Sequence, residues 1–116
     1  MSFADSVKAD YRRELKEFVT VRRFTGTGSN RPVFDAQNIR ARVFGYDAKE
    51  LIGGIQQGDR KAILYADDVI ESGLALPITD KDKLVVRGIE LSIIAPDDST
   101  RRVDGILIAY ELQVRG

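Results

Sequence analysis

The feature that most constrains the fold is the alternation of apolar and polar residues along the last stretch of the chain. Five large apolar residues recur at every second position, and the residues between them are mostly small or polar. Alternate side chains of a β-strand point to the same face, so this pattern predicts a strand with one buried side. The residues on that side are Ile106, Ile108, Tyr110, Leu112 and Val114.

A tight hairpin is predicted just upstream of this strand. The apolar segments 84–86 and 89–93 flank the dipeptide Arg87-Gly88. A two-residue connection of this kind favours a hairpin because glycine readily adopts a positive φ. The hairpin and the final strand together predict a mainly β protein, built as a small antiparallel β-barrel or sandwich.

The N-terminal segment has the periodicity of an amphipathic helix instead. Ser2 and Asp5 have the spacing of a helix-capping box. Apolar residues then repeat at intervals of three and four, which predicts a helix over residues 1–17 that packs on a barrel formed by residues 18–116. A chain of 116 residues has the length of one domain. The apolar stripe of the helix consists of Phe3, Val7, Tyr11, Leu15 and Phe18.

Two further segments, residues 18–24 and 38–44, have the alternating, β-branched pattern of strands. If these strands pair, Arg22, Arg40 and Arg42 lie along one exposed strip. Such a strip either protects the strands from edge-to-edge association or faces DNA or an acidic neighbour. The basic candidates for an interface are Arg12, Arg13, Arg22, Arg23, Arg40 and Arg42.

Residues 66–83 have no clear periodicity and are expected to form the longest irregular stretch of the chain. Acidic residues surround a short apolar segment that contains Pro77. Loops of this length in a compact domain are usually functional or disordered. The candidates for contact with a partner are Asp67, Asp68, Glu71, Leu74, Leu76, Pro77, Asp80 and Asp82.

The composition argues against most classes of enzyme. The chain has no cysteine and no histidine, which removes thiolate chemistry and the usual acid–base group at neutral pH. The pairs Asp67-Asp68 and Asp97-Asp98 lack the spacing of a calcium loop, and the second pair is typical of a turn. We therefore expect no catalytic residue, no metal and no cofactor.

The net charge is zero, with 18 basic and 18 acidic side chains, but the two signs are unevenly distributed. Residues 1–60 carry a net charge of +3, and residues 61–116 carry −3. A protein that mainly binds duplex nucleic acid needs an excess of basic residues, so this balance favours contacts between copies or with a protein partner. No segment has the pattern of a secretory signal or a membrane span, which predicts a cytoplasmic protein without membrane contact.

Several segments together resemble the small head-tail joining proteins of tailed bacteriophages, which are also called head-completion, stopper or neck proteins. The resemblance rests on residues 54–61, the strand into Ala66-Asp67-Asp68, the proline-containing loop, residues 82–93 and the long final strand. It covers roughly residues 19–116. It implies a compact β-barrel without an active site.

The resemblance also implies a ring of copies in the neck of the virion, assembled in the cytoplasm of the host bacterium. The ring lies below the portal and its adaptor, closes the DNA exit channel after packaging and docks the tail. Its partners are further copies of the chain, the adaptor and the tail terminator, with packaged DNA nearby but not bound by sequence. Residues 66–83, or otherwise residues 26–33, are expected to project into the lumen, where acidic groups repel DNA phosphates.

Three other functions stay open at this point. A tail terminator has a similar size and differs in the partner that it binds. An enzyme that uses carboxylates alone would need a deep cleft. A small barrel that binds nucleic acid would need a basic groove with stacking aromatic residues. The rings available for stacking are Phe24, Phe34, Phe44 and Tyr46, beside Arg22, Arg23, Arg31 and Arg42.

Overall fold

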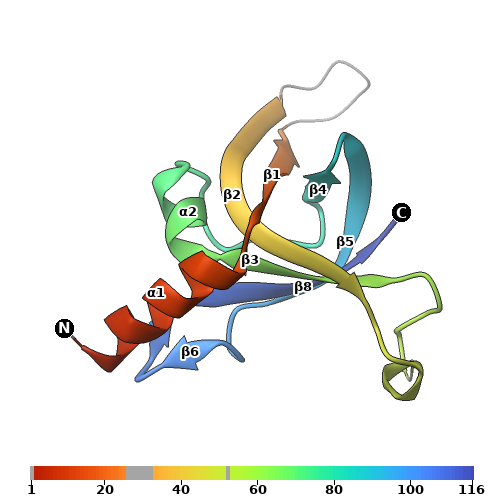
Figure 1. Cartoon of the computed structure of the whole chain (residues 1–116). Helices are drawn as coiled ribbons and strands as arrows, with labels where there is room; N and C mark the ends of the chain where they lie inside the picture. The colour runs from red at the N-terminus through yellow and green to blue at the C-terminus, as the bar shows by residue number, and fades with distance from the viewer. Residues whose placement is uncertain (1, 26–32, 52) are drawn as a thin grey trace.

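A computed structural model of the chain describes residues 2–25, 33–51 and 53–116. Two helices and eight strands, with one short 3-10 helix, follow one another along these residues (Figure 1). The elements are α1 (Phe3–Glu14), β1 (Glu17–Phe24), β2 (Val33–Gly45), η1 (Ala48–Glu50), β3 (Arg60–Tyr65), α2 (Ala66–Glu71), β4 (Lys83–Val86), β5 (Ile89–Asp97), β6 (Arg102–Val103), β7 (Ile106–Leu107) and β8 (Ala109–Arg115).

Six of the strands form a closed antiparallel barrel in the order β1-β2-β3-β8-β5-β4. The barrel closes where Thr20 of β1 pairs with Val85 of β4. The prediction of a mainly β protein with an N-terminal helix is therefore confirmed, and of the two expected architectures the chain adopts the barrel. Closure matters physically because it pairs strand edges that would otherwise be open to other chains.

The interior of the barrel is filled by alternate side chains from every strand. Val19 and Val21 of β1, Leu84 and Val86 of β4, and Leu64 of β3 are all buried in one apolar cluster. Each of these large side chains contributes about 1.5–3 kcal/mol through the removal of apolar surface from water. The period of two in the sequence thus becomes a continuous core.

The predicted hairpin at Arg87-Gly88 is confirmed. It joins β4 to β5, and Val86 pairs with Ile89 directly across the turn. Arg87 has φ 50° and Gly88 has φ 79°, so both central residues adopt the left-handed conformation of a type I′ turn. This turn matches the twist of the two strands that it connects.

The predicted final strand is correct for four of its five buried residues. Ile108, Tyr110, Leu112 and Val114 are all at most 2% exposed, whereas Ile106 is 44% exposed. The expectation for Ile106 is wrong because β7 pairs with β6 in a separate two-stranded sheet. The backbone N–H groups of Ile108 and Ala109 then donate to the carbonyl of Arg101, which is where the chain passes from that sheet into the barrel.

The capping box at the start of α1 is present, since the side chains of Ser2 and Asp5 each bond the backbone N–H of the other. The helix ends at Glu14, and not near Glu17 as predicted, because the chain becomes extended at Leu15 and enters β1. The apolar stripe is only partly confirmed. Leu15 is buried and Tyr11 packs against the same cluster, whereas Phe3 and Phe18 are exposed.

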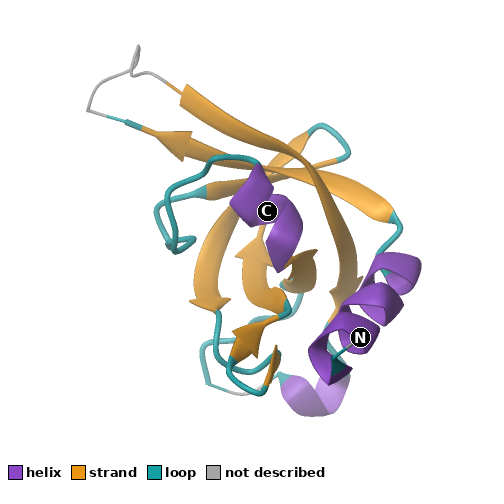
Figure 2. Cartoon of the chain, turned by 90° about the vertical axis from the view of Figure 1, so that its left-hand side faces the viewer, coloured by secondary structure: helices purple, strands orange, loops and turns teal. Residues whose placement is uncertain are grey.

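The expectation of an irregular stretch over residues 66–83 is wrong for its first six residues, which form α2. Ala66 and Val69 of this helix, with Leu74 and Ile78 beyond it, belong to the same apolar cluster as the barrel strands. Their burial stabilises a helix that is too short to persist alone. Figure 2 shows α1 and α2 on the same side of the molecule, with α2 in front of the barrel.

Neither of the two described α-helices has the length and apolar character that crossing a membrane as a helix requires.

Candidate interaction surfaces

The acidic and basic candidates from the sequence meet each other within the chain. Asp82, which is 1% exposed, accepts two hydrogen bonds of 2.8 Å from the guanidinium of Arg23. The same guanidinium donates to the carbonyl oxygens of Ala75 and Pro77, at 2.6 and 3.0 Å. Hydrogen bonding to Asp82 raises the pKa of Arg23. Arg23 thus holds residues 75–82 against β1, and its guanidinium is not available to a partner protein.

The second acidic pair holds α2 in place. Asp68 accepts from the guanidinium of Arg40 at 2.9 Å and from the backbone N–H of the same residue at 2.9 Å. Asp67 forms an ion pair of 3.1 Å with Lys8 of α1. The two carboxylates reach different partners because neighbouring residues of a helix point about 100° apart. They therefore serve as structural contacts between α2, β2 and α1.

The two strands of the predicted arginine strip pair, but their arginines are engaged within the chain and do not form one free basic surface. Arg22 lies opposite Asp35, and Arg40 lies opposite Phe18, so the two arginines are separated by four residues along the strand pair, or about 13 Å. Arg22 is also engaged, because it donates to Asp35 at 2.9 Å and to Glu90 at 3.2 Å. The hydrogen bond to Asp35 is the main cause of a raised pKa of Arg22, and the hydrogen bond to Glu90 raises this pKa further.

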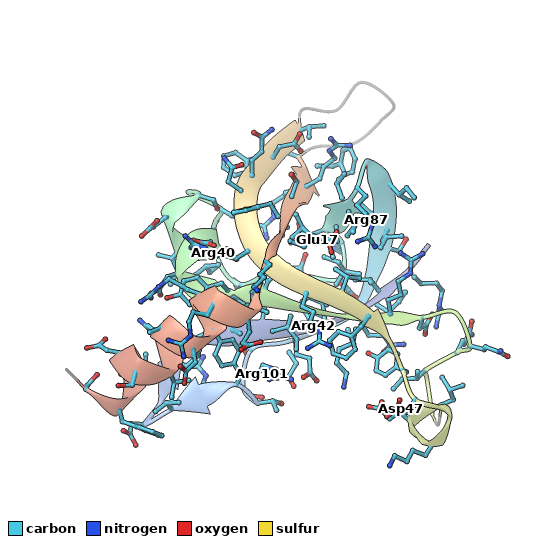
Figure 3. All side chains as sticks on the ribbon, viewed as in Figure 1. Glu17, Arg40, Arg42, Asp47, Arg87 and Arg101 are labelled. Carbon is cyan, nitrogen blue, oxygen red and sulfur yellow. The ribbon has the colours of Figure 1, made fainter. Side chains whose placement is uncertain are left out.

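The remaining basic candidates also have partners among the described residues. Arg12 donates to the hydroxyl of Tyr65 at 2.7 Å, and Arg13 pairs with Asp10. Arg42 stacks over the ring of Phe44, with 5.0 Å between the guanidinium carbon and the ring centre. In Figure 3, Arg40 lies beside α2, whereas Arg42 lies nearer to Arg101. Phe44 is half-buried against an apolar cluster, and both Arg42 and Lys61 lie over its ring.

Four of the predicted loop residues stay exposed: Glu71, Leu76, Pro77 and Asp80. Leu74 is only 5% exposed, because it fills the apolar cluster beneath α2. Of the second predicted loop, residues 26–33, all but Val33 lie outside the described residues, as does Arg31.

An exposed apolar surface that the sequence did not predict lies at the β4–β5 turn. Phe18 is 59% exposed and Ile89 is 56% exposed. An ion pair between Glu17 and Arg87 joins the start of β1 to this turn (Figure 3). Phe18 directly follows Glu17, and Ile89 is two residues from Arg87, so both apolar residues lie near this end of the barrel. We call Phe18 and Ile89, with this ion pair, the turn patch. The exposure of Phe18 could not be predicted from the sequence, because Phe18 continues the three- and four-residue spacing of the apolar stripe of the predicted helix.

Residues 46–51 and 53–57, the arm, extend from the barrel between β2 and β3 (Figure 1). Asp59 anchors the base of the arm. Its side chain is 1% exposed and accepts from Arg115 at 2.8 Å, from Gln113 at 2.9 Å and from the backbone N–H of Gln56 at 2.9 Å. The hydrogen bonds from Arg115 hold the pKa of Asp59 well below its usual range, despite burial. The arm is thus tied to β8.

Several cavities lie outside the barrel core. One of about 460 Å³ lies at the base of the arm, where Tyr46, Leu51 and Asp59 are among its lining residues. A groove of about 230 Å³ runs between α1 and the barrel, and Tyr11, Leu15 and Arg42 are among its lining residues. In its wall, Arg101 donates to Glu111 at 2.8 Å and to the hydroxyl of Tyr11 at 3.0 Å. A pocket of about 210 Å³ is lined by Pro77, Ile78, Pro96, Asp98 and Tyr110.

The predicted turn at residues 97–100 is confirmed. Asp97 accepts hydrogen bonds from the side chain of Thr100 and from the backbone and side chain of Ser99. These hydrogen bonds lower the pKa of Asp97 to about 2, and the bond from the side chain of Thr100 has the largest effect. Over residues 2–25, 33–51 and 53–116, no three acidic side chains are placed to share a metal ion.

The chain matches no protein-family model and no curated protein sequence.

Proposed function

We propose that this chain is a structural subunit of the neck of a tailed bacteriophage. In this role it forms a ring below the portal and its adaptor, closes the DNA exit channel after packaging, and docks the tail. The protein works through its shape and its contacts, without a catalytic site or a cofactor.

The observation that carries the proposal is the contrast between satisfied charges and exposed apolar residues. Most of the charged residues that could have formed a chemical site are engaged in ion pairs within the chain, as Asp82 with Arg23 and Asp68 with Arg40. Phe18 and Ile89 of the turn patch stay more than half exposed. Exposed apolar residues at one end of a rigid barrel are typical of a surface that other subunits cover.

The resemblance in sequence to neck proteins supports the same role, because it implies a compact β-barrel and the chain forms one. The barrel also carries extensions suited to contacts with more than one neighbour. The paired ends of β1 and β2, at Phe24 and Val33, and the arm extend from it in different directions (Figure 1). A ring subunit needs two different surfaces for its neighbours in the ring and further surfaces for the layers above and below.

Deletion of the reading frame from the phage genome that encodes it tests this role. Electron microscopy of the lysate should reveal separate tails beside heads that are full or that leak DNA, and a plasmid copy of the gene should restore joined particles. Intact infectious virions after deletion would rule the neck role out. Co-purification of the tagged chain with head-side proteins supports a stopper, and co-purification with the tail tube supports a tail terminator.

A further inference from the structure

Tyr110 has an unusual environment at one end of the barrel. The residue is only 2% exposed, and its hydroxyl makes no hydrogen bond with any described residue. Every fully buried side-chain nitrogen or oxygen in the described part of the chain has a partner. The hydroxyl of Tyr110 therefore keeps contact with solvent, and the pocket of about 210 Å³ that this residue lines provides it.

The walls of this pocket combine apolar surface with one negative charge. Pro77, Ile78 and Pro96 supply the apolar part, and Asp98 supplies a carboxylate. The side chain of Asp98 forms no ion pair with a described residue. The nearby Arg102 donates instead to the backbone carbonyls of Asp98 and Gly105, each at 2.8 Å. Burial and then the charge of Asp98 raise the pKa of Tyr110, whereas the charge of Arg102 lowers it. The net effect is a raised pKa, so the hydroxyl stays protonated and neutral.

The carboxylate, the hydroxyl and the apolar walls of the pocket together determine which kind of ligand it can bind. A carboxylate and a hydroxyl oxygen both accept hydrogen bonds, so the ligand must donate them, and the carboxylate favours a cation. The proline and isoleucine walls suit a slender apolar stem. Lysine and arginine side chains have a charged donor at the end of such a stem. An anionic or uncharged polar ligand would leave the Asp98 charge without a partner.

We propose that the pocket binds a lysine or arginine side chain from a second copy of this chain. This inference rests on the proposed ring and names one of its contacts. The pocket lies entirely within residues 61–116, which carry a net charge of −3, whereas residues 1–60 carry +3. Charge complementarity therefore favours contact between the two halves of neighbouring copies.

The arrangement of the molecule suits a head-to-tail contact. Asp98 lies in the connection between β5 and β6, and the arm lies on the opposite side of the barrel from β6 (Figure 1). Lys49, in the arm, is exposed and forms no ion pair with a described residue. A donor on one side and an acceptor on the other allow each copy to contact the next, and such contacts close into a ring when the rotation permits. Lys49 is therefore the first candidate donor.

Binding of the cation can be measured on the isolated protein by nuclear magnetic resonance, with tyrosine labelled by ¹³C at the ζ carbon. The chain has four tyrosines, so three signals serve as internal controls. N-acetyl-arginine amide and N-acetyl-lysine amide should shift the Tyr110 signal saturably, whereas the uncharged N-acetyl-citrulline amide should not. Asp98→Asn should weaken binding by up to about fivefold, the loss expected for one exposed charge pair. Equal shifts with citrulline, or none with the cations, would overturn the proposal.

The source of the cation is tested by sedimentation at rising protein concentration. Asp98→Asn and Lys49→Gln should each weaken self-association, whereas Lys16→Gln, which removes another exposed lysine, should not. Cation binding combined with unchanged self-association of Asp98→Asn would overturn the assignment to a second copy. Intact virions after deletion of the gene would overturn the neck role, whatever the spectra show, so the two failures are distinguishable.

Discussion

At the scale of single residues, buried polar groups differ in whether the fold satisfies them. The hydroxyl of Tyr65 accepts from Arg12 at 2.7 Å, whereas the hydroxyl of Tyr110 has no described partner. We expect Tyr65→Phe to lower the free energy of unfolding by about 1.5 kcal/mol, the range of a hydrogen bond to a charged group. Tyr110→Phe should change it by less than about 0.5 kcal/mol. Urea unfolding of both variants measures the difference, and equal losses would contradict it.

The carboxylate of Asp59 makes stability depend on pH in the acid range. Its pKa in the folded protein is lower than the ordinary value near 3.8, so folding favours the ionised form. The stabilisation is complete above that ordinary value and declines as the pH falls through it toward the folded pKa. Asp97, with a folded pKa of about 2, contributes in the same direction.

We therefore expect Asp59→Asn to flatten the dependence of unfolding free energy on pH between about 4 and 2. At pH 7, Asp59→Ala should cost about 3 kcal/mol, because it leaves the guanidinium of Arg115 without its buried partner. Asp10→Ala is the matched control, since its ion pair with Arg13 is exposed and should matter little. An Asp59→Asn variant with the slope of the wild type would contradict the assignment.

At the scale of elements, the β4–β5 hairpin depends on a conformation that side chains disfavour. Gly88 has φ 79°, and no atom lies within 4 Å of the position that a Cβ would occupy. Gly88→Ala should therefore destabilise the protein by about 1 kcal/mol through backbone strain alone. Gly54→Ala, at a position that is equally open but lacks a positive φ, should change stability by less than about 0.5 kcal/mol. Thermal unfolding of the two variants tests this, and equal effects would argue against the turn type.

The packing of α1 on the barrel gives a second prediction at this scale. Leu15, which is 4% exposed, packs with Ile63, Tyr65 and Ala109. Leu15→Ala should lower the free energy of unfolding by about 2–4 kcal/mol, as for other buried leucines. Phe3, which is 69% exposed, provides the control, and Phe3→Ala should have almost no effect. A small loss for Leu15→Ala would mean that α1 is not docked.

At the scale of the whole molecule, we expect substitutions in the exposed turn patch to weaken assembly without changing the stability of the fold. Phe18→Ser with Ile89→Ser removes apolar surface that is already in water, so the free energy of unfolding should change by less than about 0.5 kcal/mol for each. Ring formation and rescue of a deletion phage should be reduced at least tenfold if neighbours cover the patch. Phe3→Ser is the control for loss of an exposed phenylalanine. Full rescue by the double variant would exclude the patch from assembly.

Patterns within a few residues were enough to predict several elements. The positive φ of Gly88 and the capping box of α1 were predicted correctly because their physical causes are local. The inward faces of the strands were also predictable, since burial follows a period of two. The environment of Phe18 could not be predicted, because the position of Phe18 fits both the apolar stripe of a helix and the alternation of a strand.

The sequence by itself determined the class of fold, through strand periodicity and turn chemistry that act over short distances. Only the tertiary structure decided which charges are available to a partner. Arg23 and Asp82 lie 59 residues apart, as do Lys8 and Asp67, and these residues become partners only when the barrel closes. The tertiary structure also decided that Phe18 is exposed and that Tyr110 lines a pocket, because burial depends on neighbours that are distant along the chain.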